Sequence, residues 1–392
     1  MWATPYFSRV MTREELDILL QDDVREAIEQ NIDKDPLKIA LSGKIPHARE
    51  VASQVKYLQR ARHKLPRLYA ARGIIPQRAF EQSSSEECAA QKHLTGETLL
   101  DLTCGLGMDS SALAAHFKRV VALERDSILA AITTENMRRM GIENVEVVNC
   151  SAEEYLDSCE EQFDWVYVDP DRRGEQGQKL VRLEDCSPNI LALLPKIWSV
   201  TKHLAIKNSP LFDVEEAFRL FPEAQVEVIS LAGECKEVMI YTPCQNPTLV
   251  AEAIGRGRYE ALRSDIDNTP TAQEFTPDEY RYLIIPDVAL QKARLVIHSL
   301  RGKADVWSNL SFGFARELPT DILARTLEID HITPFDIKAL KRELKGKGVD
   351  IILRDFPMSV DELRKRCSMR GGDEKRIALT RIAGKSYTIY LK

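Results

Sequence analysis

Residues 101–109 of the chain are Asp101-Leu102-Thr103-Cys104-Gly105-Leu106-Gly107-Met108-Asp109. This stretch follows an apolar run at 99–102 and precedes a helical pattern at 110–118. A doubly wound α/β sheet binds nucleotide-like ligands at such a place, between its first strand and first helix. Gly105 and Gly107 would let the backbone approach the ligand closely. The alternative is a turn in which the two glycines occur by chance.

Short apolar runs alternate with helical patterns on the C-terminal side of this stretch. The alternation indicates βαβ units and a parallel sheet. The runs at 226–231 and 238–241 are too close together for a crossover helix, so we expect them to pair antiparallel. The predicted strands are 99–102, 120–123, 145–148, 163–168, 203–206, 226–231 and 238–241, and the predicted helices are 110–118, 127–140 and 189–200.

Helical patterns fill the segment before residue 93. Thr12 and Glu15 form a capping-box signature, and helical runs are expected at 12–42, with breaks at Gly43 and Pro46, and at 47–71. Beyond Pro247 the pattern loosens into two small α+β modules. The first has one predicted helix at 288–300 and strands at 282–285 and 304–308, and the second has helices at 335–344 and 359–366 and strands at 349–353, 377–382 and 387–391.

Acidic residues near the glycines indicate which ligand the loop binds. Asp101 lies four residues before the first glycine, where a carboxylate would repel a pyrophosphate but could accept a hydrogen bond from an ammonium group. The loop also lacks the third glycine of the dinucleotide pattern. Both features favour S-adenosylmethionine over NAD. Glu124 ends the second predicted strand, where an acid is expected to hold both ribose hydroxyls, although an isolated exposed acid would mean little.

A second loop, Asp169-Pro170-Asp171-Arg172-Arg173, follows the predicted strand at 163–168. It lies beside the topological switch point, where a substrate would meet the cofactor. Pro170 fixes the backbone, so that carbonyls and a carboxylate point into the cleft. The alternative is an ordinary loop whose two arginines pair with acidic residues of the central domain.

With these pieces in order, the segment 81–241 resembles the class I S-adenosylmethionine-dependent methyltransferases, especially nucleic-acid enzymes with an Asp/Asn-Pro-Pro-aromatic loop. The resemblance implies that the serines at 83–85 contact the methionine carboxylate, although they could also cap a helix. It also places the adenine amine near Ser151 and Glu153. The expected cofactor-binding residues are Ser84, Ser85, Asp101, Thr103, Gly105, Gly107, Asp109, Glu124, Arg125, Ser151, Ala152, Glu153 and Asp169.

The second loop departs from that family pattern. Asp171 and Arg172 replace the second proline and the aromatic residue that would stack on a target base. Asp171 could act as a general base instead, and Arg172 or Arg173 could bind phosphate. Lys207, at the end of the fifth predicted strand, could bind phosphate or a developing negative charge, or could be a surface lysine. The expected catalytic residues are Asp169, Pro170, Asp171 and Lys207.

The whole chain is similar to bacterial proteins in which such a domain precedes a ferredoxin-like and a THUMP-like module. The segments that carry this similarity are 182–188, 207–210, 233–237 and 363–381. THUMP domains belong to RNA-modifying enzymes, so the resemblance implies an RNA substrate. The expected architecture is α/β: an N-terminal helical domain at 1–92, a Rossmann-like seven-stranded methyltransferase sheet at 93–246, and small α+β modules at 250–318 and 319–392.

The cysteines form no pattern of their own. The chain has eight, none in a Cys-x-x-Cys pair or a zinc-like Cys/His cluster, which predicts reduced thiols and no structural metal. Cys235 could be a nucleophile or a buried bystander, and Cys104 is expected to pack against the cofactor. Apolar runs are too short to cross a membrane, and the N-terminus lacks a signal-peptide pattern, so a cytoplasmic location is expected.

Charge is distributed unevenly along the chain, whose net charge is −6. Residues 44–78 contain nine basic residues and one acidic residue, Glu50, whereas the centre of the chain is acidic. Such a basic run, interleaved with aromatic residues, fits an RNA backbone, or alternatively a solvated helix docked on the acidic domain. A second basic group surrounds Gly371 and Gly372. The expected RNA-binding residues are Lys56, Arg60, Arg62, Lys64, Arg172, Arg173, Arg364, Arg366 and Arg370.

The leading hypothesis is an S-adenosylmethionine-dependent methyltransferase acting on structured RNA, tRNA or rRNA, in which alignment of donor and acceptor dominates catalysis. One alternative keeps the cofactor but has a small-molecule or protein acceptor. The other is an RNA-binding protein that retains the fold without turnover. The oligomeric state is left open by the sequence.

Overall fold

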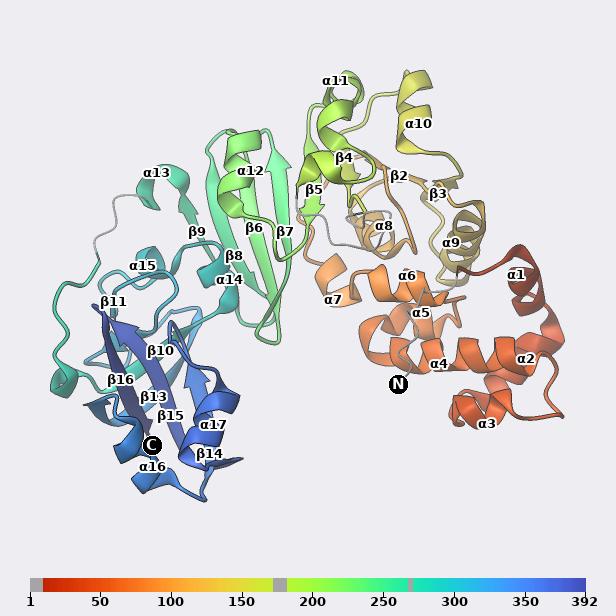
Figure 1. The fold of residues 1–392 in the computed structure, drawn as a ribbon. Coiled ribbons are helices and arrows are strands. Elements are labelled where there is room, and N and C mark those ends of the chain that lie inside the picture. The colour runs from red at the N-terminus through yellow and green to blue at the C-terminus, as the bar shows by residue number, and fades with distance from the viewer. Residues whose placement is uncertain (1–9, 172–181, 267–270) are drawn as a thin grey trace. The chain divides into compact units, whose positions relative to one another are not determined.

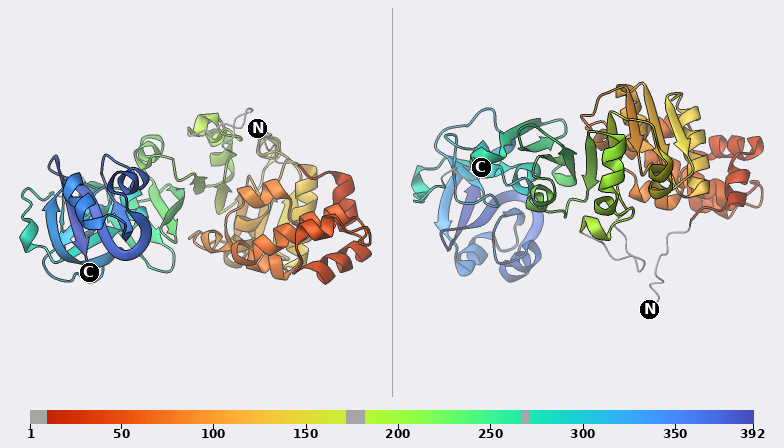
Figure 2. Two further views of the ribbon diagram at one scale, coloured as in Figure 1. Left: turned by 60° about the horizontal axis from the view of Figure 1, so that its bottom comes forward. Right: turned by 90° about the horizontal axis from the view of Figure 1, so that it is seen from above.

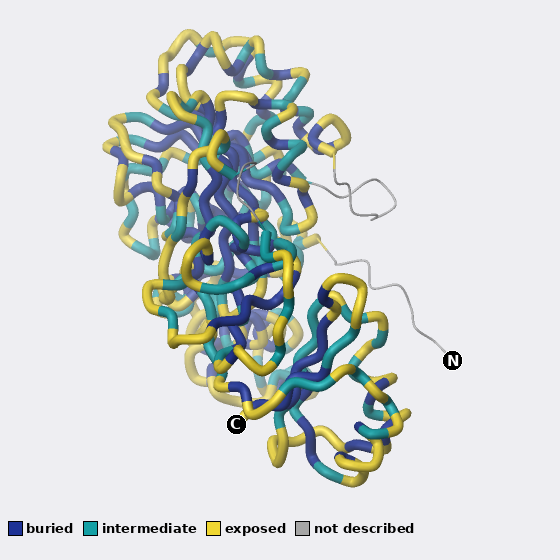
Figure 3. Tube along the Cα trace, turned by 90° about the vertical axis from the view of Figure 1, so that its left-hand side faces the viewer, coloured by how far each residue is buried: buried dark blue, intermediate teal, exposed yellow. Residues whose placement is uncertain are grey.

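The computed structural model describes residues 10–171, 182–266 and 271–392. The chain forms two compact units. The first comprises Met1–Phe212 with Ile240–Pro243, and the second comprises Asp213–Met239 with Cys244–Lys392. Both units contain buried residues, and the buried segments of the chain are drawn in dark blue in Figure 3. Of the predicted loop at 169–173, the structure describes Asp169, Pro170 and Asp171. The predictions for Arg172 and Arg173 therefore lie outside the described residues.

The first unit begins with helices, as the sequence predicts. Thr12 caps the first helix in a capping box with Glu15, and proline occupies the first turn of α3 and α5. In both views of Figure 2 the red and orange helices lie together beside the yellow segments. The helices are α1 (Arg13–Leu19), α2 (Asp22–Asn31), α3 (Pro36–Ala40), α4 (Ala48–Lys64), α5 (Pro66–Ala70), α6 (Gln77–Gln82) and α7 (Glu86–Ala89).

These helices share a core with the glycine loop that follows them. Val51, Val55 and Leu58 form the buried face of α4, and they belong to one apolar cluster with Leu106 and Met108. The spacing of the three α4 residues is that of one helix face. The N-terminal helices therefore support the loop through direct packing.

Parallel strands form the centre of the first unit, in the order β3-β2-β1-β4-β5 (Figure 1). The order reverses between β1 and β4, which makes their carboxyl ends the expected ligand-binding edge. The last residues of β7 also belong to this unit and β7 follows β5 in the strand order. The elements are β1 (Thr98–Asp101), α8 (Met108–Leu113), η1 (Ala114–His116), β2 (Arg119–Leu123), α9 (Ser127–Arg139), β3 (Val145–Val148), α10 (Ala152–Ser158), β4 (Trp165–Val168), η2 (Leu183–Asp185), α11 (Ile190–Val200) and β5 (Leu204–Asn208).

The second unit opens with strands in the order β7-β6-β8-β9. Ala232 and Gly233, both with positive φ, make the tight turn that joins β6 to β7, as the predicted hairpin requires. The seven predicted strands are all present, the last two are joined as the predicted hairpin, and β8 and β9 are additional. These elements are α12 (Val214–Leu220), β6 (Gln225–Leu231), β7 (Glu234–Thr242), β8 (Thr248–Ala253), β9 (Gly257–Leu262) and α13 (Arg263–Ile266).

The rest of the second unit is a sheet in the order β11-β12-β10-β13-β16-β15-β14. Strands from the predicted modules at 250–318 and 319–392 thus share one sheet, and the four-domain division stays a prediction. The predicted single helix at 288–300 is wrong, because Arg294 adopts φ 58° and separates two helices. The elements are η3 (Pro277–Glu279), β10 (Tyr282–Pro286), α14 (Val288–Lys292), α15 (Val296–Ser299), β11 (Asp305–Val306), β12 (Gly313–Ala315), β13 (Ala324–Pro334), α16 (Ile337–Leu344), β14 (Gly348–Leu353), α17 (Val360–Cys367), β15 (Arg370–Ile382) and β16 (Lys385–Leu391).

Candidate active site

The two glycines of the loop after β1 have different surroundings. Gly107 has φ 79°, and a Cβ there would lie 2.5 Å from Met137 Cε and 2.7 Å from Thr133 Cγ2. Gly105 has φ 55°, and among the described residues no atom lies within 4 Å of the position its Cβ would take. Gly107 therefore permits packing against α9, whereas Gly105 leaves open backbone for a ligand.

Asp101 supports this loop from inside the fold. Its side chain is 1% exposed, and its carboxylate accepts hydrogen bonds from the Thr103 backbone N–H (2.9 Å) and the Ser110 hydroxyl. Burial raises the pKa of Asp101 to about 7. The internal bonds place Asp101 beneath the loop, and its assignment as a cofactor ligand stays a prediction.

Glu124 joins the glycine loop to the start of α9. Its carboxylate accepts from the backbone N–H of Gly105 at 3.0 Å and of Asp126 at 2.8 Å. Burial raises the pKa of Glu124 above its ordinary value. A carboxylate beside the open backbone at Gly105 fits a diol such as the ribose of an adenosine cofactor, so the residues present match S-adenosylmethionine.

Asp169 and Pro170 continue directly from β4. The Asp169 N–H donates to Thr103 Oγ at 2.7 Å, which ties the second loop to the glycine loop. Asp171 is half-buried: its backbone exchanges hydrogen bonds of 2.8 and 3.0 Å with Ser187, and its carboxylate lies 3.5 Å from an Arg78 nitrogen. The Thr103 side chain thus links the glycine loop to the second loop. Pro170, in the second loop, is buried.

Parallel register brings Lys207 to the same edge. Val168 of β4 pairs with Ile206 of β5, so Asp169 and Lys207 follow paired residues. Their carboxylate oxygen and Nζ are 2.6 Å apart. Lys207 is 8% exposed, which excludes the alternative of a surface lysine.

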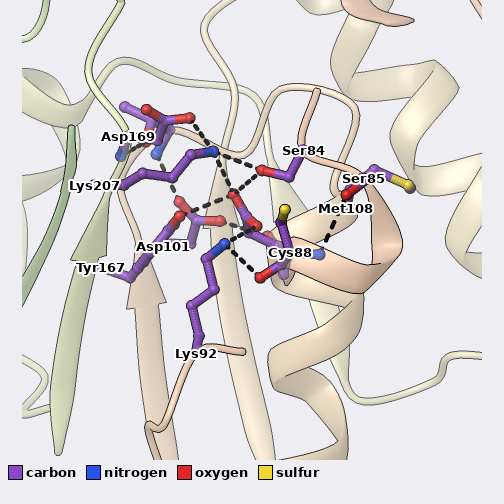
Figure 4. Close-up of polar contacts among 12 residues, drawn as sticks. Ser84, Ser85, Cys88, Lys92, Asp101, Met108, Tyr167, Asp169 and Lys207 are labelled. Atoms are coloured by element: carbon purple, nitrogen blue, oxygen red, sulfur yellow. Dashed lines mark hydrogen bonds and ion pairs between the residues drawn. The ribbon is translucent and has the colours of Figure 1, made fainter. Parts of the chain in front are cut away.

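A buried polar cluster surrounds Lys207, as Figure 4 shows. Its Nζ donates to Ser84 Oγ at 2.6 Å and lies 3.0 Å from an Asp109 oxygen. The Tyr167 hydroxyl donates to the same Asp109 oxygen at 2.8 Å, and Lys92 Nζ lies 3.1 Å from the other one. Although burial favours the neutral carboxyl, Lys207 and Lys92 hold the pKa of Asp109 below its ordinary value.

Sequence reasoning missed Lys92 and Tyr167. Tyr167 lies within an apolar strand, opposite Asp101 of β1, and Lys92 stands alone before β1. No sequence pattern marks either residue, because both contact Asp109, which is distant from them in the sequence and close only in the folded chain. Ser84 was predicted, and the structure places it in this cluster.

Other predicted cofactor residues cap helices or lie at neighbouring strand ends. Ser85 accepts from the Cys88 N–H and caps α7, as the alternative interpretation expected. Ser151 caps α10 in a capping box with Glu154, while Ala152 is buried and Glu153 exposed. Arg125 is exposed and donates to Ser187 Oγ at 3.0 Å. The adenine contacts stay a prediction.

The predicted RNA-binding residues of α4 differ in their exposure and in their contacts with other residues of the chain. Lys56 and Arg60 are exposed, and the Arg60 guanidinium lies 5.4 Å from the ring centre of Tyr57. Arg62 is paired with Asp33. Lys64 is half-buried and donates to the Phe80 carbonyl at 2.6 Å, and burial lowers its pKa to about 8.

In the second unit, Arg366 is exposed, Arg364 is half-buried beside Gly371, and Arg370 donates to the Gly346 carbonyl at 2.9 Å.

The two cysteines considered in the sequence have different surroundings. Cys235 is half-buried, and burial raises the pKa of its thiol to about 11, which disfavours the thiolate that a nucleophile needs. Cys104 is buried in the glycine loop. No helix in the described ranges is long and apolar enough to cross a membrane.

Two family models match parts of the chain. The one described as Conserved hypothetical protein 95 matches residues 82–185, which include the glycine loop and Asp169. The one described as THUMP domain-like matches residues 324–392. The second match covers β13 to β16 with α16 and α17.

Known proteins resemble the chain over most of its length. An uncharacterized S-adenosylmethionine-dependent methyltransferase of Mycobacterium tuberculosis is 24% identical, and the match covers 82% of this chain and 88% of that protein. A crystal structure from Porphyromonas gingivalis W83, provisionally assigned as a methyltransferase, superposes with a TM-score of 0.83 at 24% identity and covers 98% of this chain and 99% of that one. The latter likeness establishes the fold.

A shorter match concerns the small-subunit ribosomal RNA methyltransferase J of Francisella philomiragia. It is 31% identical over 22% of this chain and 42% of that protein. The predicted class, enzyme type and cofactor are confirmed by these comparisons taken together: the chain is an S-adenosylmethionine-dependent methyltransferase. It carries a C-terminal THUMP-like domain.

Proposed function

We propose that the chain methylates a nucleotide in structured RNA, either tRNA or rRNA. The main structural observation behind this proposal is the 2.7 Å hydrogen bond from the Asp169 N–H to Thr103 Oγ. This bond fixes the start of the second loop, which we call the acceptor loop, against the glycine loop. The THUMP-like match at 324–392 supports RNA as the substrate class. The match of 22% of this chain to a ribosomal RNA methyltransferase agrees with this class.

The bound cofactor supplies an electrophilic methyl group, and the chain's residues position the acceptor. Pro170 is buried and Asp171 is paired through its backbone with Ser187, so the acceptor loop begins from fixed positions. Proximity and orientation of this kind account for much of the rate of a bimolecular transfer. The Asp171 carboxylate, 3.5 Å from Arg78, is a candidate base for a proton leaving the acceptor.

RNA would meet the exposed face of α4. Arg49, Lys56 and Arg60 are all exposed, and their spacing places them along one side of the helix. Positive charge in a row favours the phosphate backbone, because binding releases condensed counterions. The exposed Arg366 of α17, with Arg364 and Arg370, is a second candidate contact in the THUMP-like domain.

An acceptor screen tests this proposal. Purified protein and labelled S-adenosylmethionine are incubated with total RNA, total protein and small-molecule extract from cells that lack the protein. We expect label in RNA, and its loss with the variant Asp169→Ala. Label confined to protein or small molecules would establish the alternative acceptor, and RNA binding without label in any fraction would establish a non-catalytic RNA-binding protein.

A further inference from the structure

Two arginines lie at the start of the acceptor loop. There Asp171 and Ser187 exchange backbone hydrogen bonds of 2.8 and 3.0 Å. Arg78 of α6 has a guanidinium nitrogen 3.5 Å from the Asp171 carboxylate. Arg125, the second residue after β2, donates to Ser187 Oγ at 3.0 Å. Two segments that are distant in the sequence thus each place one guanidinium group beside the same backbone pair.

Both guanidinium groups keep hydrogen-bond donors for a ligand. Arg125 is exposed, its contact at Ser187 is with a neutral hydroxyl, and no carboxylate of the described ranges lies within ion-pair distance of it. Arg78, whose side chain is 40% exposed, donates from Nε to Gln82 at 3.2 Å and reaches Asp171 only at the outer limit of a hydrogen bond. Since a guanidinium group has five N–H donors, most of these donors have no partner in the part of the chain that the structure describes.

The number and placement of these cations indicate which ligand they bind. S-adenosylmethionine carries a single anionic group, its carboxylate, whereas an internal RNA nucleotide has a phosphate on each side. Arginine also binds phosphate through two parallel hydrogen bonds, which fix its orientation. Two separate guanidinium groups beside the loop that holds Asp171 therefore match an RNA chain better than they match the cofactor.

Helix α6 connects this point with the basic face of α4. The Arg60 guanidinium lies 4.9 Å from the ring centre of Phe80, and Lys64 donates to the Phe80 carbonyl at 2.6 Å. Arg78 precedes Phe80 by two residues, which is about 200° around a helix, so it points away from α4. Burial, together with the charges of Arg60 and Lys207, lowers the pKa of Lys64 to about 8, so this end of α4 lies near the active site. Basic side chains thus lead from α4 across α6 to the acceptor loop.

We propose that Arg78 and Arg125 bind the two phosphates that flank the acceptor nucleotide of the RNA, one on each side. The basic face of α4, with Lys56 and Arg60, binds the adjoining backbone beyond Arg78. This assignment replaces the cofactor contact that the sequence suggested for Arg125. It rests on the RNA substrate of the proposed function, and it names the contacts that place one nucleotide at the acceptor loop.

RNA binding by the full chain over a salt series tests this assignment. The probes are total tRNA and total rRNA from cells that lack the protein, measured separately. We expect Arg78→Gln and Arg125→Gln each to reduce the slope of log affinity against log salt by about 0.7–0.9, and the double variant by about twice as much, because each lost phosphate contact lowers the number of counterions released. Arg78→Lys and Arg125→Lys keep the charge and should keep the slope.

Methyl-transfer kinetics and calorimetry separate the two possible roles of Arg125. In each Gln variant, the KM for the RNA fraction that accepts label should rise about 10-fold, with the affinity for S-adenosylmethionine unchanged. Arg119→Gln is the matched control, because Arg119 begins the same strand, β2, at its opposite end and is already paired with Glu146 at 3.1 Å. Its slope and its KM for RNA should equal those of the wild type.

The outcomes distinguish this inference from the proposed function. An unchanged slope in the double variant, or the same loss of slope in Arg119→Gln, would overturn the inference while RNA methylation stands. Weaker binding of S-adenosylmethionine by Arg125→Gln would return that residue to the cofactor and overturn the two-sided contact. If the wild type neither binds RNA nor transfers label to it, the RNA substrate of the proposed function is contradicted, and the inference with it.

Discussion

Gly105 and Gly107 are two residues apart, and the space around their Cβ positions differs. Both adopt positive φ, yet only Gly107 is closely packed, against Thr133 and Met137 of α9. At Gly105, by contrast, the Cβ position is open among the described residues. Gly107 thus faces the core, and Gly105 is the glycine that we expect to face the ligand.

We therefore expect the two alanine variants to separate stability from binding. Gly107→Ala should lower the free energy of unfolding by about 2–4 kcal/mol, because it adds backbone strain and overpacks the contact with α9. Gly105→Ala should cost about 1 kcal/mol but weaken cofactor binding, because its Cβ enters the open space. Urea denaturation and calorimetry check the pair, and equal stability losses would contradict the assignment.

Asp101 gives the stability of the fold a pH dependence. Its pKa is raised from 3.8 to about 7 by burial, so the folded state keeps a proton that the unfolded chain loses between about pH 4 and 7. The contribution of Asp101 is therefore fully present at low pH and is lost as the pH rises through this window. Asp101→Asn cannot ionise, and its stability relative to the wild type should rise by about 2 kcal/mol from pH 5 to pH 8.

Urea denaturation at the two pH values measures this difference. Glu160→Gln, at an exposed position, is the control for the loss of one acidic residue. A difference between wild type and Asp101→Asn that stays constant from pH 5 to pH 8 would show that Asp101 is ionised throughout in the folded state.

The sequence identified the loop residues but not the cluster behind them. Asp101, Gly105, Glu124 and Asp169 could be found because each directly follows a recognisable strand or turn signal. Lys92 could not be found, because its contact with Asp109 depends on the packing of α7 and the following segment against α8. A single lysine also forms no spacing pattern with other residues in the sequence. Lys207 was found, but its burial and hence its chemistry required the register of β4 and β5.

Among the elements, those with strong periodicity were predicted correctly and those with polar surfaces were missed. The parallel strands β1, β2 and β4 are mostly apolar and mostly buried. By contrast, β9 and β13 each contain a single buried residue, so they lack the apolar alternation that marks a strand. The break at Arg294 was missed because its left-handed backbone occurs at a residue that ordinarily continues a helix.

Helix α4 is the element whose function can be tested separately. Replacing Lys56 and Arg60 together with Gln should weaken RNA binding and reduce the slope of log affinity against log salt by about 2, with cofactor affinity unchanged. Filter binding over a salt series measures the slope. The control pair, Lys118→Gln with Lys196→Gln, removes two charges already paired with Glu97 and Asp157. An unchanged slope in the α4 variant would indicate that this face does not contact phosphate.

At the scale of the whole molecule, the chain joins a methyltransferase fold to a THUMP-like domain. The first unit contains the glycine loop, Asp169 and the basic face of α4, so the predicted donor and acceptor positions need no residue of the second unit. The sheet from β10 to β16 has its own cores on both faces: Ile377 and Leu379 pack with α16 and α17, while Ala378 and Ile382 belong to the other cluster.

The most direct measurement is nucleoside mass spectrometry of tRNA and rRNA from cells with and without the protein. We predict one methylated nucleoside that disappears when the protein is absent, and that the wild-type protein restores but Asp169→Ala, produced at the same level, does not. Identical nucleoside profiles in the presence and absence of the protein, in all RNA fractions, would contradict its assignment as an RNA methyltransferase.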